Sequence, residues 1–488
     1  MVSFNYIPVS TLRVPGVYVE TNNSNANTGQ VLQNALICAQ MLSSGTATPN
    51  VPVAVSGNYN TLFGAGSMAS IMCARFLKNN VSTQLYVLPV LDNANAVVAT
   101  ETLTVSGPAS AAGTVSLYIA GNLIQATVNT GDTANTIASS IKTAINNTSN
   151  LPVTASVSNA TVTCTTLNGG VAAGDIDYRL NYAGTLSNQV TPTGVSVQFT
   201  QTQAGAVEPV WTTALSNLGS TNFDFIMFPY TDSASLAAIE SFLSDASGRW
   251  SYQEQLFGHA WTAYRGNLST LLTLGSTNNN QHLTAIGVND TPQAMYDVVA
   301  ACVASASQSL SADPAIPLQN LAVDVLAPPI QSRFSNVNNN SLLYAGITPL
   351  KWDISNQGYF VRAVTTYQYN TSGQQDNSYL DVNTMYELMY VERYFINQLS
   401  SIYNRVKLLP DGSQIAAGSQ ATTAQLIKGQ CIALYNNLAG LNVVVNPSQF
   451  AQQVTATNVG NGTVEIYLPV QLANQLRVIA IQVSFSKP

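Results

Sequence analysis

Charged side chains are what this chain of 488 residues has least of. Asp, Glu, Lys and Arg together make up 8% of the sequence, whereas about 25% is usual for a globular protein. No charged residue occurs between Thr21 and Ala74, where Asn, Ser, Thr and Gln are frequent. A surface with so little charge does not repel a second copy of itself, so the composition favours a densely packed homo-assembly. A composition bias of the host is the alternative explanation.

Basic clusters and long apolar runs are also missing. The net charge is -7 and the pI is near 4.8, and without a basic stripe to neutralise phosphates we expect no nucleic-acid partner. No apolar run reaches the roughly 18 residues of a membrane helix, so we expect no membrane insertion. Residues 1–6 lack the basic start and apolar core of a signal peptide. We therefore expect synthesis in a cytoplasm.

Cysteine and histidine are too scarce for most kinds of active site. The five cysteines have no paired spacing, which indicates buried thiols in a reducing compartment and neither a disulfide framework nor a metal site. Of the two histidines, His259 is the best candidate for a general base. No Gly-x-Ser-x-Gly nucleophile signature accompanies it, so we interpret it as structural. We expect His282 to lie in a loop.

Two further motifs are weak. Residues 64–69 fit the loose dinucleotide pattern Gly-x-Gly-x-x-Ala, with Asp92 downstream, but no convincing strand precedes them. A turn into a helix, with Ser67 near the N-cap, explains this segment better. Asp175 and Asp177 alone are too few oxygen ligands for calcium, and we expect them in a solvated loop. The sequence thus predicts no cofactor, no metal and no catalytic residue.

Strand and helix patterns alternate in two separate stretches, residues 31–96 and 206–327. Helix starts are expected near Ser67, at Asp232, and at Thr291, which a proline follows at the first helical position. Buried strands are expected at residues 35–39, 85–88, 225–228 and 283–288. This alternation predicts one discontinuous α/β core domain with a largely parallel sheet.

The remaining stretches have different patterns. Residues 97–205 contain alternating Thr/Val strands and one helix capped near Asp132, which predicts an inserted β-rich outer domain. Residues 328–474 predict a C-terminal α+β domain, with a strand-like stretch at 358–369, a long helix capped by Asp381, a second helix at 422–438 and a hairpin turning at 460–462. The fold class is therefore multidomain α/β and α+β.

Both ends of the chain are strand-like and have no evident partner. Residues 1–30 are expected to be an N-terminal linking arm, and residues 475–488 a C-terminal linking strand. An unpaired edge invites aggregation unless another chain fills it, so we expect strand exchange between subunits. Pairing of both ends within the chain's own sheet is the alternative. The residues expected to carry the exchange are Val17, Tyr18, Val19, Leu476, Val478, Ile479, Ile481, Val483 and Phe485.

Residues 13–20 (RVPGVYVE) resemble the opening of contractile-tail sheath subunits, and more closely those of Mu-like bacteriophages. Other segments resemble the same branch in the same order along nearly the whole chain. They are 62–68 (LFGAGSM), 228–232 (FPYTD), 258–266 (GHAWTAYRG), 365–368 (TTYQ), 379–382 (YLDV) and 474–478 (NQLRV). Their order and spacing are specific, although no single motif is. The low charge departs from the family, since Lys428 is the only charged residue in the helix at 422–438.

The resemblance implies a structural protein of the virion tail and no enzyme. It implies self-assembly into hexameric rings stacked around a tail tube protein, with baseplate and tail terminator proteins as further partners and with residues 328–474 lining the inner side. Contraction of such a sheath drives the tube through the host envelope for genome delivery. A sheath of a tail-derived bacteriocin or injection machine is an alternative. Alternatives of another class are a hydrolase dependent on His259 and a cell-binding adhesin using residues 97–205.

Overall fold

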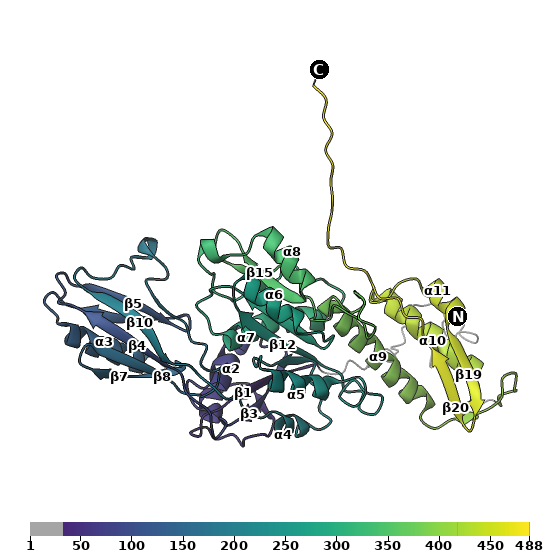
Figure 1. Ribbon diagram of the computed structural model, residues 1–488. Helices are drawn as coiled ribbons and strands as arrows, with labels where there is room; N and C mark the ends of the chain where they lie inside the picture. The colour runs from purple at the N-terminus through teal and green to yellow at the C-terminus, as the bar shows by residue number, and fades with distance from the viewer. Residues whose placement is uncertain (1–32, 417, 488) are drawn as a thin grey trace, which may run out of the picture. The chain divides into compact units, whose positions relative to one another are not determined.

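The computed structural model describes residues 33–416 and 418–487. Two compact units divide this part of the chain (Figure 1). The larger unit contains residues 33–389, 441–445 and 471–487, and the smaller contains residues 390–440 and 446–470. The expected N-terminal arm, with Val17, Tyr18 and Val19, lies outside the described residues.

A nine-stranded sheet forms the centre of the larger unit, in the order β14-β16-β15-β13-β12-β11-β1-β3-β2. The six strands from β15 to β3 are parallel, and β2, β16 and β14 are antiparallel to their neighbours. The buried strands expected from the sequence are confirmed at β1, β3, β11 and β13. The bounds are β1 Asn34–Gln40, β2 Val53–Val55, β3 Gln84–Val90, β11 Phe225–Met227, β12 His259–Arg265, β13 Leu283–Val288, β14 Ala322–Val323, β15 Ile347–Trp352 and β16 Gly358–Phe360.

Helices join these strands as the alternating pattern predicts. Ser67 caps α2, its hydroxyl accepting from the Ser70 amide at 3.0 Å, and Asp232 caps α5. The expected helix start at Thr291 is wrong. The Thr291 hydroxyl donates to the Leu326 carbonyl, and α7 begins only at Met295. The bounds are α1 Tyr59–Phe63, α2 Met68–Asn79, α4 Thr212–Ser216, α5 Ser233–Leu243, α6 Leu268–Ser276, α7 Met295–Ala312 and α8 Asn336–Tyr344.

The sheet continues past the domain boundary expected at residue 327. β15 pairs in parallel with β13, with Ala285 opposite Ile347, and β16 follows β15 by a short return. The strand-like stretch at 358–369 forms a strand only at Gly358–Phe360. Beyond it the amides of Thr365 and Thr366 donate to the Leu380 and Leu283 carbonyls. The larger unit instead continues to Met389, and the smaller unit begins at Tyr390.

Residues 97–205 form two small sheets, β10-β4-β8-β7 and β6-β5-β9, around a separate apolar core to which one helix contributes. This helix, α3, is capped by Thr133, while the Asp132 carboxylate accepts from the Asn129 amide in the turn before it. The bounds are β4 Thr100–Ser106, β5 Gly113–Ile119, β6 Asn122–Val128, α3 Ala134–Asn147, β7 Val153–Ser158, β8 Thr161–Thr166, β9 Tyr178–Leu180 and β10 Ser196–Gln203.

The smaller unit is built from helices and one hairpin. The rings of Tyr435 and Phe450 stack at 3.8 Å between centroids and join α10 to α11. The hairpin is confirmed, with positive φ at Gly460, Asn461 and Gly462 in its turn. The bounds are α9 Val382–Tyr403, which begins in the larger unit, β17 Lys407–Leu408, β18 Ala421–Thr422, α10 Ala424–Gly440, α11 Pro447–Gln453, β19 Thr455–Gly460 and β20 Thr463–Tyr467.

Candidate functional site: an exposed terminal arm and its anchored root

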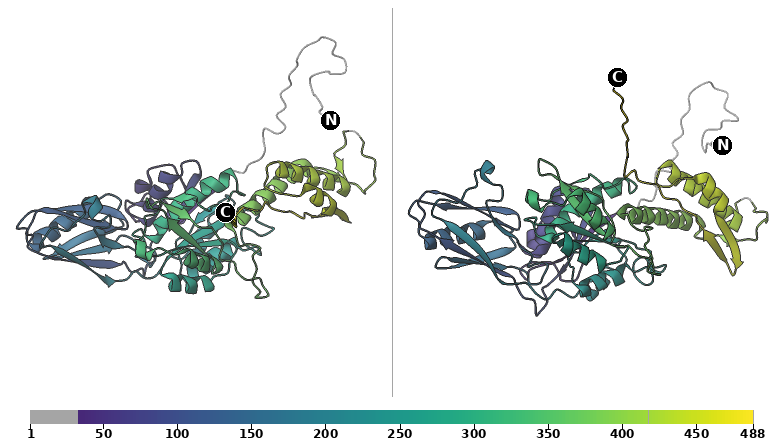
Figure 2. Two further views of the ribbon diagram at one scale, coloured as in Figure 1. Left: turned by 90° about the horizontal axis from the view of Figure 1, so that it is seen from above. Right: turned by 45° about the horizontal axis from the view of Figure 1, so that its top comes forward.

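The candidate site is the segment 471–487, which we divide into a root (471–477) and an arm (478–487). No residue of the arm forms a strand with any other described residue, and Figures 1 and 2 draw the arm as an extended trace. Its apolar side chains lie in solvent. The exposed fractions are 80% for Val478, 71% for Ile479, 80% for Ile481, 81% for Val483 and 81% for Phe485, and Leu476 in the root is 65% exposed.

Alternation gives the arm two different faces. In an extended chain successive side chains point to opposite sides, so Ile479, Ile481, Val483 and Phe485 share one face. Ala480, Gln482 and Ser484 lie on the other. Exposed apolar side chains gathered on one surface are typical of an interaction site. The arm therefore presents an apolar face for a sheet that this chain does not itself supply among its described residues.

The root is held to the larger unit by both backbone and side-chain contacts. The Val445 amide donates to the Gln471 carbonyl at 2.9 Å, and the Ala473 amide donates to the Val443 carbonyl at 3.1 Å. Further along, the Gln319 side chain donates to the Leu476 carbonyl at 3.1 Å. The chain is thus fixed up to the residue at which the arm begins.

Arg477 closes the root with a shared ion pair. Its guanidinium donates to Asp381 at 2.9 Å, and Arg362 donates to both oxygens of the same carboxylate at 2.8 Å. Nε and Nη1 of Arg477 are buried without a hydrogen-bond partner among the described residues. Asp381 was expected to cap α9, and it lies directly before Val382. Its carboxylate accepts hydrogen bonds from both arginines.

Glu387, on the first turns of α9, lies beside the same root. The Gln475 side chain donates to its carboxylate at 3.4 Å. Burial, helped by the nearby carboxylates of Asp313 and Asp381, raises the pKa of Glu387 to about 8, against the lowering by Gln475 and Arg477. This carboxyl group is therefore largely protonated at neutral pH, and Asp381 supplies the negative charge at the root.

His259 lacks the surroundings of a general base. It is fully buried in β12, with Nε2 at 2.8 Å from the Thr284 hydroxyl on β13, and burial lowers its pKa well below the usual value. Nδ1 has no hydrogen-bond partner among the described residues, whereas a catalytic triad places a carboxylate there. His282 precedes β13 as expected but is buried against Trp250 and bonds Asp245 at 2.9 Å.

Comparisons with known proteins decide the family. A family model described as "Phage tail sheath protein central domain" matches residues 204–366. The Mu-like prophage FluMu tail sheath protein of Haemophilus influenzae is 32% identical over 490 residues, which cover 99% of each chain. This chain belongs to the phage tail sheath protein family. As a sheath protein it is a structural component of the contractile tail of a phage or a phage-like machine, and its homologues are structural proteins.

Two solved structures resemble this chain at low sequence identity. The sheath tail protein Lin1278 of Listeria innocua is 13% identical, with 92% of this chain and 94% of that chain covered and a TM-score of 0.49. A chain of the anti-feeding prophage baseplate is 10% identical, with 98% and 100% covered and a TM-score of 0.48. The family assignment rests on the sequence relationship.

The weaker motifs of this sheath protein have structural roles. The turn at 64–69 is covered by the inserted segment, because the Gly66 amide donates to Asn150 and the Met68 amide donates to Asn168. The carboxylate of Asp92 accepts from Gln40, Asn168 and the Gly169 amide.

The five cysteines are buried, as expected. The described residues contain no group of three His, Cys, Asp or Glu side chains suited to a metal. None of the described helices combines the length and apolarity of a membrane span.

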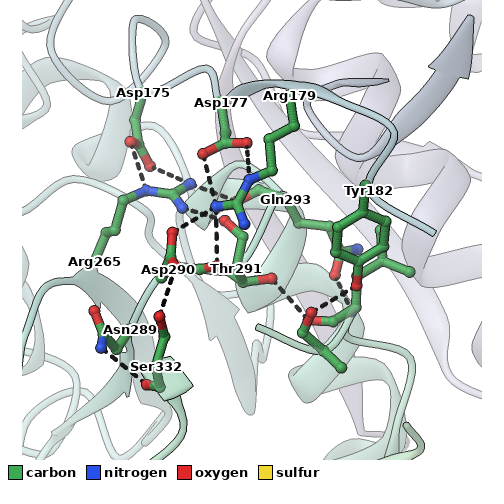
Figure 3. A network of polar contacts seen from close by, with 12 residues as sticks. Asp175, Asp177, Arg179, Tyr182, Arg265, Asn289, Asp290, Thr291, Gln293 and Ser332 are labelled. Carbon is green, nitrogen blue, oxygen red and sulfur yellow. Dashed lines mark hydrogen bonds and ion pairs between the residues drawn. The ribbon is translucent and has the colours of Figure 1, made fainter. Parts of the chain in front are cut away.

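Asp175 and Asp177 lie in a loop, as expected, but their carboxylates are only partly exposed and are held in ion pairs. Asp175 pairs with Arg265 at 2.9 Å and Asp177 pairs with Arg179 at 2.6 Å (Figure 3). The partner of Asp175 lies 90 residues further along the chain. Sequence reasoning missed this cluster, although the close spacing of three charged residues in a charge-poor segment was a signal for it.

Proposed function

We propose that this sheath protein polymerises by donating its arm as an extra strand to a neighbouring copy. Subunits linked in this way form hexameric rings stacked around a tail tube, as the family resemblance implies. Contraction of this lattice drives the tube through the host envelope and delivers the genome. The contact is carried by Val478, Ile479, Ile481, Val483 and Phe485 of the arm and Leu476 of the root, together with Val17, Tyr18 and Val19 in an N-terminal arm.

The exposed apolar face of the arm is the observation that carries the proposal. Four side chains on one face are 71–81% exposed, while the root before them is bonded to the body. Burying one such side chain stabilises by about 1.5–3 kcal/mol, so leaving four of them in water is costly. The root fixes the origin of the arm. The backbone donors and acceptors of the arm stay available to a partner sheet.

The hairpin β19–β20 of a neighbouring copy is the acceptor that we propose. Among the described residues it is a two-stranded sheet, in which each strand has one edge open to a further strand. Hairpins of two strands are only marginally stable alone. Val459 and Tyr467 on this hairpin are 49% and 63% exposed. Five added main-chain hydrogen bonds at about 0.5–1.5 kcal/mol each would contribute roughly 3–7 kcal/mol per arm.

The other parts of the chain have proposed roles in the same assembly. The discontinuous α/β core forms the body of the subunit, residues 97–205 an outer domain, and the C-terminal helices and hairpin the inner side toward the tube. Tube, baseplate and tail terminator proteins are the proposed partners. Contraction is driven by interfaces that are better buried in the contracted state, and roughly 400 Å² of extra apolar burial would supply about 10 kcal/mol per subunit at most. A bacteriocin or injection machine would use the same subunit mechanics.

Deletion of an arm tests the proposal. Removing residues 475–488, or residues 1–20, should abolish long sheath polymers in electron micrographs and leave folded monomers in sedimentation. Removing only residues 487–488 is the matched control, because it spares every apolar arm position. Full-length contractile sheaths from either long deletion would refute arm exchange. Labelling of the intact protein by an active-site serine probe would favour the hydrolase alternative, and cell binding by residues 97–205 alone would favour the adhesin.

A further inference from the structure

The few charges of the inserted domain (residues 97–205) are unevenly placed. This stretch contains six charged residues, and three of them, Asp175, Asp177 and Arg179, occur within five positions. All three form ion pairs where the inserted domain meets the core sheet (Figure 3). Half of the charges of a charge-poor domain thus lie at one junction, which favours a specific role for them there.

The two ion pairs across this junction are crossed: the inserted domain supplies the acid of one pair and the base of the other. Asp175 of the inserted domain accepts from Arg265 of the core at 2.9 and 3.2 Å. Arg179 of the inserted domain donates to the carboxylate of Asp290 in the core at 2.7 Å and to its carbonyl at 2.9 Å. Each side contributes one acid and one base. A shifted docking would place like charges together, so crossed pairs favour one arrangement over others.

Three of the four members of the crossed pairs, Arg179, Asp290 and Arg265, are also held by contacts within their own domain. Asp177 binds Arg179 in a bidentate pair at 2.6 and 2.9 Å, and the Ser332 hydroxyl donates to Asp290 at 2.7 Å. Arg265 also donates to the carbonyls of Thr291 and Gln293. Because these groups are oriented before docking, little side-chain entropy is lost when the pairs form.

Close packing surrounds the ion pairs. The Tyr182 hydroxyl donates to the Ala327 carbonyl at 2.6 Å. At Gly121, in the turn between β5 and β6, an added Cβ would lie 2.9 Å from Leu326 and 3.0 Å from Gln293. The backbone of the inserted domain at Gly121 therefore packs directly against side chains of the core.

A second attachment lies elsewhere along the same edge of the sheet. Asp92 follows β3 and accepts from Asn168 and the Gly169 amide. Val97 and Ala206, where the chain enters and leaves the inserted domain, pair in an antiparallel β-bridge. Arg265 and Asp290 lie at the ends of β12 and β13 instead, with β11 and β1 between β12 and β3. Since neighbouring strands lie about 4.8 Å apart, the two attachments are separated by roughly 15–20 Å. The bonds from the turn at 64–69 to Asn150 and Asn168 belong to this second attachment. The ion pairs hold the inserted domain at a separate place and so restrict pivoting about the second attachment.

We propose that Asp175, Arg179, Arg265 and Asp290 are positioning residues whose crossed ion pairs lock the inserted domain onto the carboxyl edge of the core sheet in one orientation. The two domains of this sheath protein then move as one rigid body. The lock is electrostatic, so its effect depends on opposite charges at these positions and not merely on filled space.

Distance measurement between two spin labels tests the lock in the full chain. The native cysteines are buried, so labels attach selectively to cysteines introduced by Ser158→Cys on exposed β7 and Ser269→Cys on exposed α6. The parent should give one narrow distance distribution. The neutral double variant Asp175→Asn with Arg179→Gln should lose this single distance and give a broad distribution, while both domains remain folded by amide exchange. Arg265 keeps its carbonyl partners in that variant.

Two matched variants decide between charge and shape. Asp175→Glu with Arg179→Lys keeps the signs and should retain the narrow distribution, and Lys142→Gln removes a charge from the same domain outside the junction and should change nothing. An unchanged distribution in the neutral variant would overturn the proposal. A charge-conserving variant as broad as the neutral one would also overturn it, and so would a neutral variant that fails to fold.

Discussion

Arg477 and Asp381 form an ion pair of 2.9 Å at the residue where the exposed arm begins. Asp381 is shared, because Arg362 binds both of its oxygens at 2.8 Å. Arg362 therefore holds this carboxylate more fully than Arg477 does. Arg477 also has Nε and Nη1 buried without hydrogen-bond partners among the described residues. The origin of the arm is consequently fixed by an ion pair in which Asp381 is shared between two arginines.

Replacing Arg477 should free the root without unfolding the core. In Arg477→Gln the root loses a charged hydrogen bond of about 1–3 kcal/mol, while Asp381 keeps Arg362. Amide exchange in residues 471–477 should become at least about fivefold faster, and sheath polymers should become shorter. Hydrogen exchange by mass spectrometry measures the first effect and electron microscopy the second.

Arg477→Lys is the matched control, because it keeps the charge but not the planar guanidinium. Its amide exchange in the root and its polymer length should lie between those of the parent and those of Arg477→Gln. Unchanged protection of the root in Arg477→Gln would show that backbone contacts alone anchor it.

Glu387 should make the protein less stable as the pH rises. Burial raises its folded pKa to about 8 from an ordinary value of 4.5, so between these pH values the folded state holds a proton that the unfolded state has lost. The free energy of unfolding therefore decreases through this range, by about 1.4 kcal/mol for each pKa unit of difference. Glu387→Gln should remove this slope and raise the melting temperature at pH 8 in calorimetry.

The exposed Glu254→Gln variant serves as the control for Glu387→Gln and should leave the pH slope as it is in the parent. An identical slope in Glu387→Gln and the parent would mean that Glu387 ionises normally in the folded state.

The two faces of the arm should respond differently to added charge. Ile481→Asp with Phe485→Asp places charges on the apolar face and should prevent polymerisation, because a buried unpaired carboxylate is strongly disfavoured. Gln482→Asp with Ser484→Asp adds the same charges to the other face and should weaken assembly less. Sedimentation velocity measures both, and equal loss in the two variants would argue against a strand with one buried face.

The same arm variants should leave the monomer's melting temperature within about 1 °C of the parent, because these side chains are already exposed in the single chain. A large drop in melting temperature would place the arm inside the monomer's own core.

His259 should contribute to stability and not to chemistry. His259→Ala leaves a cavity and an unpaired Thr284 hydroxyl, and should lower the free energy of unfolding by about 2–4 kcal/mol in urea titrations. Because burial, with a smaller effect of His282, lowers the pKa of His259, the unfolded state alone takes up a proton below about pH 6.5. The parent should therefore lose stability below that pH, and His259→Ala should lose less of it. A His259→Ala variant that is as stable as the parent, or that loses as much stability below about pH 6.5 as the parent does, would contradict this role.

Local pattern was sufficient for much of the fold. The apolar runs at β1, β3, β11 and β13 predicted buried parallel strands, and Ser67 and Asp232 predicted helix starts, because periodicity and capping are properties of neighbouring residues. No strand is predicted from the sequence at β12, where His259 and Trp261 are buried. His259 suggested a catalytic role there and not a strand. The start of α7 was misplaced because Thr291 bonds to Leu326, 35 residues away, which no local pattern reveals.

The sequence by itself determined the alternating strands and helices, the two-faced arm and the scarcity of charge that suits self-assembly. Tertiary structure alone decided which charges meet: Asp175 with Arg265, Arg179 with Asp290, and Arg477 with Asp381. Each of these pairs joins residues about 90 to 111 positions apart. The physical reason is that periodicity reports which side of its own element a residue occupies, whereas an ion pair depends on how separate elements pack in space.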